Sequence, residues 1–156
     1  MNTFKLTEQE IKLIPPHSQL NSGRSIDTVE PWHIDSFNAT KYIKDLMINR
    51  GVKSPKMKEI MTAVFSNVAM HTDNLSPTSC CTLAVMLKGH GELIHTIVPP
   101  DFTKTGRLIT KSKHVQENEA FYFDFHLPHQ WINKSKENCI AILADVDREQ
   151  VMEMKR

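Results

Sequence analysis

Several features that define common protein classes are missing from this sequence. Its three cysteines are an odd number without CxxC spacing, so neither a disulfide framework nor a zinc finger is indicated. No run approaches the roughly 18 apolar residues of a membrane helix, and the first ten residues lack the apolar core of a signal peptide. We therefore expect a protein of a reducing compartment, the cytoplasm, with no membrane partner.

The charge balance and the missing motifs exclude further classes. Nineteen basic and eighteen acidic residues are scattered along the chain and leave a formal charge of +1, so nucleic acid is not indicated as a partner. The sequence contains no Gly-rich phosphate loop and no nucleophile elbow. This argues against nucleoside triphosphatases and serine hydrolases.

The length of 156 residues predicts a single domain over residues 1–156, because domains commonly run from roughly 100 to 150 residues. Within it we expect three parts. An N-terminal arm and helix occupy residues 1–55, a β-barrel occupies residues 56–146, and a C-terminal tail, either a short helix or a frayed end, occupies residues 147–156.

The clearest helix is predicted over residues 37–50. Ser36 precedes it as an N-cap, its apolar residues fall at helical spacing, and Gly51 stands where a C-terminal glycine belongs. Such a helix has an apolar stripe that must cover something, most simply one face of a sheet. Earlier in the chain, Thr7 and Glu10 have capping-box spacing, which predicts a short helical turn or docking arm before the Pro15-Pro16 pair.

Two segments have no regular pattern. Residues 17–35 are rich in Ser, Asn, Gly and Pro and indicate an ordered loop or an irregular strand. Residues 56–70 can be read at either the helical or the strand period. Their second half contains Thr62, Val64 and Val68, which favour a strand.

From there onward the pattern is that of an all-β protein. The expected strands are residues 79–88, 92–98, 107–115, 120–125, 129–133 and 139–146. A Gly89-His90-Gly91 turn joins the first two as a hairpin. Strands at intervals of about ten residues are typical of a sandwich or barrel.

Residues 117–133 combine a polar turn, an aromatic strand and a corner that leads into a second strand. Alternation places Phe121, Phe123 and Phe125 on one face of the first strand. It places His129, Trp131 and Asn133 on one face of the second. The stretch resembles the second motif of the cupin superfamily, in which an acidic turn is followed by Pro, His and then Asn. Pro128, His129 and Asn133 match that order.

His71 and Asp73 form the second candidate site, because side chains two apart on a strand point to the same side. With His129 they give two imidazoles and one carboxylate, a set that suits Fe(II) with positions left open for other ligands. The order resembles that of the double-stranded β-helix shared by cupins and Fe(II)/2-oxoglutarate oxygenases, over residues 68–146. That resemblance implies a mainly β jelly-roll fold with one or two N-terminal helices packed on a sheet, and a divalent metal held by His71, Asp73 and His129.

The resemblance also implies a cation that pairs with 2-oxoglutarate where that co-substrate is used. No Lys or Arg follows His129 at the usual distance, so Lys88 or Arg107 from an intervening strand is expected in that role. Other residues leave alternatives open. His126 competes with His129 but is expected in the corner loop. His95 is a fourth ligand, a base beside the metal or an ordinary core histidine.

Trp131 and Asn133 are also assigned to the pocket or to its support. Trp131 lines the pocket or fills the barrel, and Asn133 is expected to form hydrogen bonds within the strand corner.

The resulting hypothesis is a metal-dependent enzyme, a non-haem Fe(II) dioxygenase or hydroxylase acting on a small molecule. Two alternatives stand beside it: a non-catalytic jelly-roll module that binds a small ligand or a protein, and a metal-dependent isomerase or lyase. Many relatives in this superfamily pair through their sheets, so a homodimer is also expected.

Overall fold

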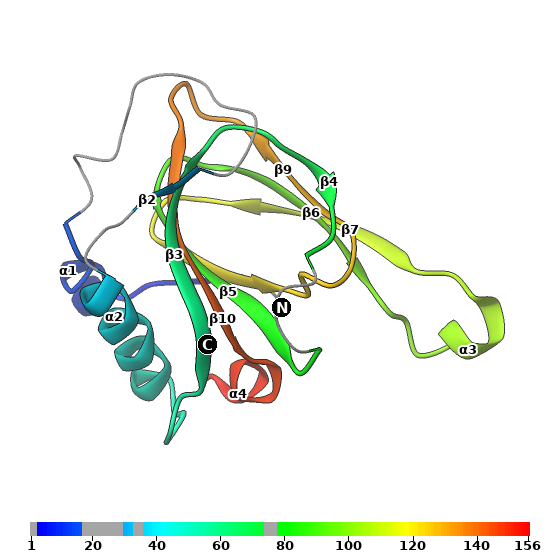
Figure 1. Ribbon diagram of the computed structural model, residues 1–156, viewed down its shortest axis with the longest axis horizontal. Coiled ribbons are helices and arrows are strands. Elements are labelled where there is room, and N and C mark those ends of the chain that lie inside the picture. Colours follow the sequence, from blue (N-terminus) through cyan, green and yellow to red (C-terminus); the bar gives the residue numbers. More distant parts are fainter. Residues whose placement is uncertain (1–2, 17–29, 33–35, 74–77) are drawn as a thin grey trace.

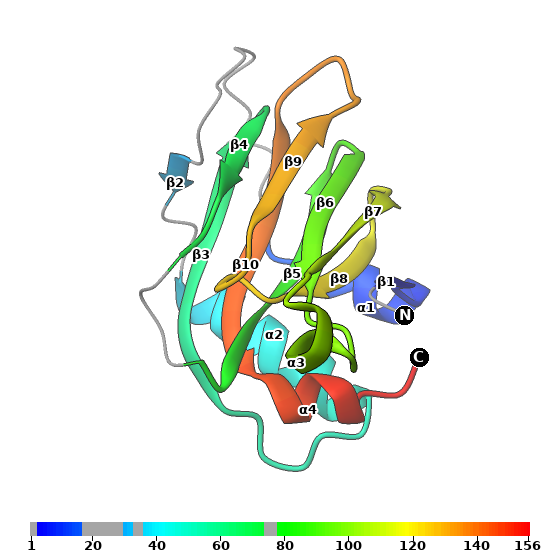
Figure 2. The same ribbon diagram turned by 90° about the vertical axis from the view of Figure 1, so that its right-hand side faces the viewer.

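A computed structural model describes residues 3–16, 30–32, 36–73 and 78–156. They form two antiparallel sheets that face each other, with helices on the outer face of the larger one (Figures 1 and 2). Most of the irregular segment predicted at residues 17–35 lies outside the described residues. Its described part contains strand β2 (Glu30–Trp32), which pairs with β3 at the sheet edge.

The large sheet has six strands in the order β1-β8-β5-β10-β3-β2, and the small sheet has four in the order β4-β9-β6-β7. The remaining large-sheet strands are β1 (Thr3–Lys5), β3 (Met57–Phe65), β5 (Cys80–Lys88), β8 (Glu119–Phe123) and β10 (Cys139–Asp147). The small-sheet strands are β4 (Val68–His71), β6 (Gly91–Ile97), β7 (Ile109–Val115) and β9 (His129–Asn133).

The eight strands from β3 to β10 follow the path of a jelly roll. The chain passes between the sheets at every step except β6 to β7, so each sheet takes four of these strands. This order is the double-stranded β-helix, which confirms the predicted mainly β fold. The ambiguous segment at residues 56–70 is strand in both halves, β3 and β4, with a bend between them. The short strand β1 was not predicted, and it extends the large sheet beside β8.

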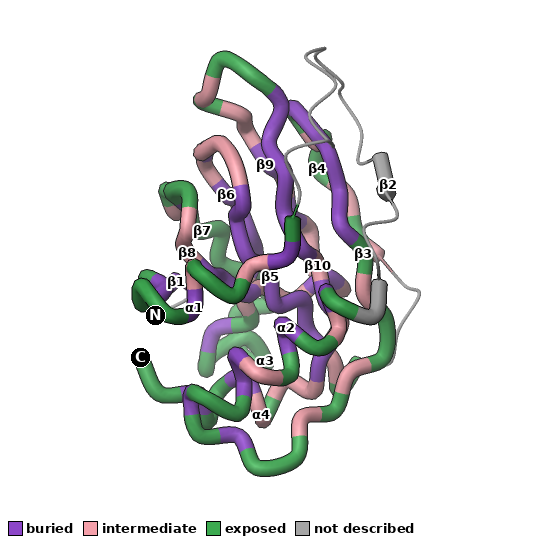
Figure 3. The backbone as a smooth tube through the Cα atoms, turned by 90° about the vertical axis from the view of Figure 1, so that its left-hand side faces the viewer, coloured by how far each residue is buried: buried purple, intermediate pink, exposed green. Residues whose placement is uncertain are grey.

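The large sheet is covered on both faces, which explains the nearly continuous burial of β5 and β10. Alternate residues of β5 contribute to two separate cores. Leu83 and Val85 pack with the buried face of helix α2 (Ser36–Asn49), whereas Ala84 and Met86 pack between the sheets. Figure 3 shows this burial concentrated along the two central strands.

Helix α2 confirms the predicted helix to within one residue at each end. Its Ile43 and Met47 are fully buried one turn apart. At its C-terminus the Gly51 N–H donates to the Ile48 carbonyl and the Val52 N–H to that of Met47, and Gly51 has a φ of 101°. This is the Schellman arrangement that a glycine at this position indicates.

The N-terminal arm forms helix α1 (Glu8–Lys12), and its predicted capping box is present. The Thr7 N–H donates to Glu10 Oε1 at 2.8 Å, and the Glu10 N–H donates to Thr7 Oγ1 at 3.2 Å. Two further short helices complete the chain, α3 (Phe102–Thr105) in the β6–β7 connection and α4 (Arg148–Glu153) after β10. The C-terminal tail is therefore a short helix in its first part.

A buried ion pair joins the arm to the helix that covers the sheet. Arg50 donates from Nε to Glu10 Oε2 at 2.9 Å and from Nη2 to Glu10 Oε1 at 2.7 Å. It also donates to the carbonyls of Lys5 and Lys155. One guanidinium thus connects segments from both ends of the described chain.

Candidate functional site

The small sheet places His71 and His129 directly opposite each other on β4 and β9. Asp73 lies beyond the end of β4, which stops at His71 on the edge of the sheet. The Asp73 N–H donates to the Phe125 carbonyl at 2.8 Å, so the β8–β9 connection holds it in place. Asp73 therefore lies just past the strand that carries His71, and not on that strand as expected, although its side chain still meets that of His71.

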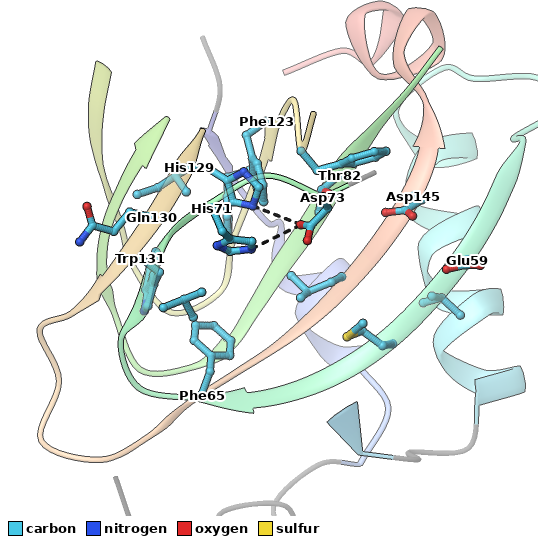
Figure 4. A pocket seen from close by; sticks show the side chains of 17 residues that line it. Glu59, Phe65, His71, Asp73, Thr82, Phe123, His129, Gln130, Trp131 and Asp145 are labelled. Atoms are coloured by element: carbon cyan, nitrogen blue, oxygen red, sulfur yellow. Dashed lines mark ion pairs between the residues drawn. The ribbon is translucent and has the colours of Figure 1, made fainter. Parts of the chain in front are cut away.

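The three side chains converge on one point (Figure 4). Asp73 Oδ2 is 3.5 Å from His71 Nε2 and 3.3 Å from His129 Nε2. One ligand-type atom from each residue lies within 4.8 Å of the other two, which makes the group a candidate holder of a metal ion.

Both imidazoles are oriented by backbone carbonyls. His71 Nδ1 is 2.7 Å from the Ala69 carbonyl oxygen, and His129 Nδ1 is 2.8 Å from that of Leu127. A carbonyl oxygen only accepts, so each Nδ1 carries the hydrogen, and the Nε2 of a neutral ring carries a lone pair. Two nitrogen lone pairs and a carboxylate oxygen then face one another. A cation placed between them stabilises this arrangement, so the donor set fits a divalent metal.

Burial differs between the two histidines. The side chain of His129 is 7% exposed and that of His71 is 37% exposed. Burial lowers the pKa of His129 and the neighbouring His71 adds to this, while the contacts to Leu127 and Asp73 act in the opposite direction. His129 is therefore held toward the neutral form that binds metals.

The site opens into a cavity of about 260 Å³ between the two sheets. Five aromatic side chains line it: Phe65, Phe121, Phe123, Phe125 and Trp131. The three phenylalanines of the segment at residues 120–125 thus share one face, as their alternation predicted. The volume is near the lower end of the roughly 300–1,000 Å³ of small-molecule sites, which fits a molecule of about one ring.

Sequence reasoning missed several polar residues of the cavity. Thr82, Gln130, Glu59 and Asp145 line it together with the three converging residues. Asp145 could have been found, because it alternates with inward-facing Leu143 along a strand whose earlier residues are all apolar. Glu59 could not, because the first half of residues 56–70 fits both the helical and the strand period.

Lys88 and Arg107, the two residues expected to pair with 2-oxoglutarate, are not among the described residues that line the cavity. Lys88 ends β5 and its Nζ is 2.9 Å from Glu137. Arg107 is exposed just before β7, where its N–H donates to Thr105 Oγ1. No Lys or Arg is among the described residues that line the cavity.

The remaining histidine candidates also do not line the cavity as described. His95 is buried on β6 directly opposite His129, so His71, His129 and His95 form a row across three strands. Burial, followed by the charges of Lys111 and Lys113, lowers the pKa of His95. His126 lies in the predicted corner, with its ring centroid 4.1 Å from that of Phe125.

Trp131 and Asn133 differ in their position relative to the cavity, because only Trp131 is among its described lining residues. Trp131 lines the cavity, and its ring lies edge-on to Phe65 at 5.8 Å between centroids. Asn133 instead supports the turn that follows β9. Its Nδ2 donates to the Glu137 carbonyl, and its Oδ1 accepts from the Ser135 N–H. Its Nδ2 also donates to Ser66 Oγ, at the bend between β3 and β4.

The sequence matches no protein-family model and no curated protein. Solved structures of cupin-fold proteins do match it. The strand order of the two sheets is that of a double-stranded β-helix. Vicilin from hazelnut (Corylus avellana) is 13% identical, with a TM-score of 0.40 over 58% of this chain and 24% of vicilin.

Two enzymes are also among the matching structures. Oxalate oxidase in complex with the substrate analogue glycolate is 15% identical, with a TM-score of 0.42 over 56% of this chain and 41% of the oxidase. A mutant of Bacillus subtilis oxalate decarboxylase is 13% identical, with a TM-score of 0.42 over 58% of this chain and 22% of the decarboxylase. The match therefore spans less than half of each of these longer chains.

Among the described helices, none is both long enough and apolar enough to span a membrane.

Proposed function

We propose that this protein is a mononuclear metal enzyme, a non-haem Fe(II) dioxygenase or hydroxylase that oxidises a small molecule in the cavity between its sheets. The observation that supports this proposal is the convergence of His71 Nε2, His129 Nε2 and Asp73 Oδ2 on one point. Two imidazoles and one carboxylate are the ligands of non-haem Fe(II) oxygenases, and they leave positions open.

The residues around the cavity would have the following roles. His71, His129 and Asp73 would hold the metal, which when bound supplies a redox centre able to activate O₂ beside a bound substrate. The Ala69 and Leu127 carbonyls keep both Nε2 atoms aimed at the site. The aromatic walls exclude water and hold the substrate against the same point.

We further infer that the reaction does not use 2-oxoglutarate. That co-substrate needs a cation for its distal carboxylate, and the described lining of the cavity contains neither Lys nor Arg. Lys88 is engaged with Glu137, and Arg107 is exposed before β7.

The test is the metal content of protein purified without a tag or chelator, followed by anaerobic titration with Fe(II). We expect one ion per chain, no new absorption band on adding 2-oxoglutarate, and loss of the ion in Asp73→Asn. Asp145→Asn is the matched control, because it removes another carboxylate of the same cavity and should keep the ion.

The other outcomes separate the alternatives. A charge-transfer band with 2-oxoglutarate would overturn the inference about that co-substrate. A stoichiometric ion without O₂ consumption, tested against a panel of small aromatic compounds, would favour an isomerase or lyase. Absence of any ion after metal loading would contradict the proposal and favour a binding module.

A further inference from the structure

The connection between β6 and β7 carries a large share of the exposed apolar side chains. We call residues 98–113 the β6–β7 tip; it contains helix α3 and part of β7, and residues 100–112 are all exposed. Figure 1 shows α3 beyond the barrel, at one end of the longest axis and on the side away from α2. Nine large hydrophobic side chains are exposed among the described residues, and four of them belong to the tip: Val98, Phe102, Leu108 and Ile109. Exposed apolar side chains gathered in this way mark an interaction surface.

Hydrogen bonds within the tip fix its backbone. The Phe102 N–H donates to the Pro99 carbonyl at 3.1 Å, and the Gly106 N–H donates to the Phe102 carbonyl at 2.7 Å. Gly106 ends α3 with a φ of 66°, a conformation that glycine adopts without strain, and the Arg107 N–H then donates to Thr105 Oγ1. The apolar side chains therefore stand on a preformed backbone, which lowers the entropy cost of binding through them.

The same segment is basic. It contains four cations and one carboxylate, a net charge of +3 in a chain whose total is +1, so the rest of the chain is net negative. The cations are Lys104, Arg107, Lys111 and Lys113. Within the described part of the chain none of the four forms an ion pair. A surface of this kind attracts an anionic partner that also offers an apolar interior.

Two other partners fit these features less well. A second copy of the chain would pair along β7, the edge strand of the small sheet, and antiparallel pairing would bring Lys111 and Lys113 of one copy beside those of the other. A nucleic acid would attract the cations and its bases would stack on Phe102. The aliphatic side chains of Leu108 and Ile109 would still lack an apolar partner.

We propose that the β6–β7 tip binds the surface of an anionic membrane. Its apolar side chains enter the boundary between headgroups and acyl chains, and its cations lie against the anionic headgroups. The contact is peripheral and needs no spanning helix, so it would correct the expectation that the protein has no membrane partner. It does not depend on the candidate metal site.

Flotation of the full chain with lipid vesicles tests the proposal. One set of vesicles is phosphatidylcholine alone, and in the other about one third of the lipid is phosphatidylserine. We expect the protein to bind the anionic vesicles at least roughly tenfold more strongly, because each cation near such a surface contributes roughly fivefold. This binding should weaken as the salt concentration rises.

A first variant removes charge from the tip. The double variant Lys104→Gln and Arg107→Gln should weaken binding to the anionic vesicles by roughly fivefold for each charge removed. Lys136→Gln is the matched control, because it removes an exposed cation from the turn between β9 and β10. It should bind as the wild type does.

A second variant removes apolar surface and keeps the charge. The double variant Phe102→Ser and Leu108→Ser should weaken binding by roughly tenfold, since both side chains would no longer enter the lipid. Ile48→Ser is the control, because Ile48 is similarly exposed, on helix α2. All of these side chains are exposed, and thermal unfolding checks that each variant folds.

Several outcomes would overturn the proposal. They are equal binding to both kinds of vesicle, binding to neither, and losses in the controls as large as those in the tip variants. Light scattering that gives the mass of two chains, reduced in the Phe102→Ser and Leu108→Ser variant, would assign the tip to a second copy if vesicles are not bound. Binding of a single-stranded RNA oligonucleotide without vesicle binding would assign it to nucleic acid.

Discussion

His71 and His129 face each other across β4 and β9 with ring centroids 4.4 Å apart, and both use the same backbone contact. In each, Nδ1 meets the carbonyl two residues earlier in the chain. The two rings are thus oriented by local backbone, and neither depends on a distant side chain for its tautomer.

The first prediction distinguishes His129 from His126 by their effects on metal binding. His129→Ala should weaken metal binding by more than the roughly 10- to 100-fold typical of losing only a supporting contact, because it would remove one of the three proposed ligands. His126→Ala should leave metal binding unchanged, since that ring packs against Phe125. Competition with a chromogenic chelator measures both. Equal losses would remove His129 from the ligand set.

The second prediction concerns the buried ion pair. Arg50→Met leaves the Glu10 carboxylate buried without its countercharge, and we expect the free energy of unfolding to fall by about 3–5 kcal/mol. Lys41→Met is the control. It breaks the exposed Lys41–Asp45 pair and should cost at most about 0.5 kcal/mol. Urea unfolding compares the two, and similar losses would contradict the role of Arg50.

The third prediction is a pH dependence of stability. Burial alone would raise the pKa of Glu10, but the contacts with Arg50, Thr7 and Asn49 outweigh it and lower the pKa to about 2 from 4.5. Because the folded-state pKa is depressed, the stabilisation is complete above about pH 4.5 and is lost as the pH falls toward 2. It amounts to about 3 kcal/mol.

The measurement compares the free energy of unfolding of wild type and Glu10→Gln from pH 6 to pH 2. The difference between the two proteins should shrink as the pH falls, because the variant cannot titrate at residue 10. A constant difference across that range would show that the pKa of Glu10 is not depressed in the folded state.

The fourth prediction concerns Gly91, which begins β6 beside Trp131. A Cβ at Gly91 would lie 2.3 Å from the Ile132 carbonyl oxygen and 2.6 Å from the Trp131 ring. Gly91→Ala should cost about 3 kcal/mol, the upper end for overpacking, and should shift Trp131 fluorescence. The fluorescence is best measured in a Trp32→Phe background, because the chain has two tryptophans.

Gly106→Ala is the control for this change. Gly106 has a φ of 66° and open space around its Cβ position, so alanine there should cost only about 1 kcal/mol of backbone strain and leave the fluorescence unchanged. A fluorescence shift in both variants would mean that Trp131 responds to general destabilisation.

The parts of the fold that the sequence predicted are those set by local patterns. Helix α2 follows from apolar spacing and Gly51. The turn at Gly89–Gly91 was also predicted, but the hairpin was wrong, because β5 pairs within the large sheet and β6 within the small one. The convergence of His71 and His129 could be predicted because a family resemblance supplied the strand pairing that periodicity alone cannot give.

The remaining features depend on contacts between distant residues. Nothing local to Glu10 indicates that Arg50, forty residues later, will neutralise it. Strand β1 exists because β8 offers it an edge, and a three-residue strand has too short a pattern to detect. The position of Asp73 depends on the Phe125 carbonyl, so a strand pattern extended past His71 could not give it.

The two sheets contribute different things to the cavity. The imidazoles His71 and His129 belong to the small sheet, whereas Glu59 and Asp145 belong to the large one. The polar groups on one sheet can therefore be changed while those on the other are left intact. A library that randomises the inward positions of β3 and β10 would vary one wall of the cavity and leave the candidate metal site unchanged, which makes this barrel a convenient starting point for engineering.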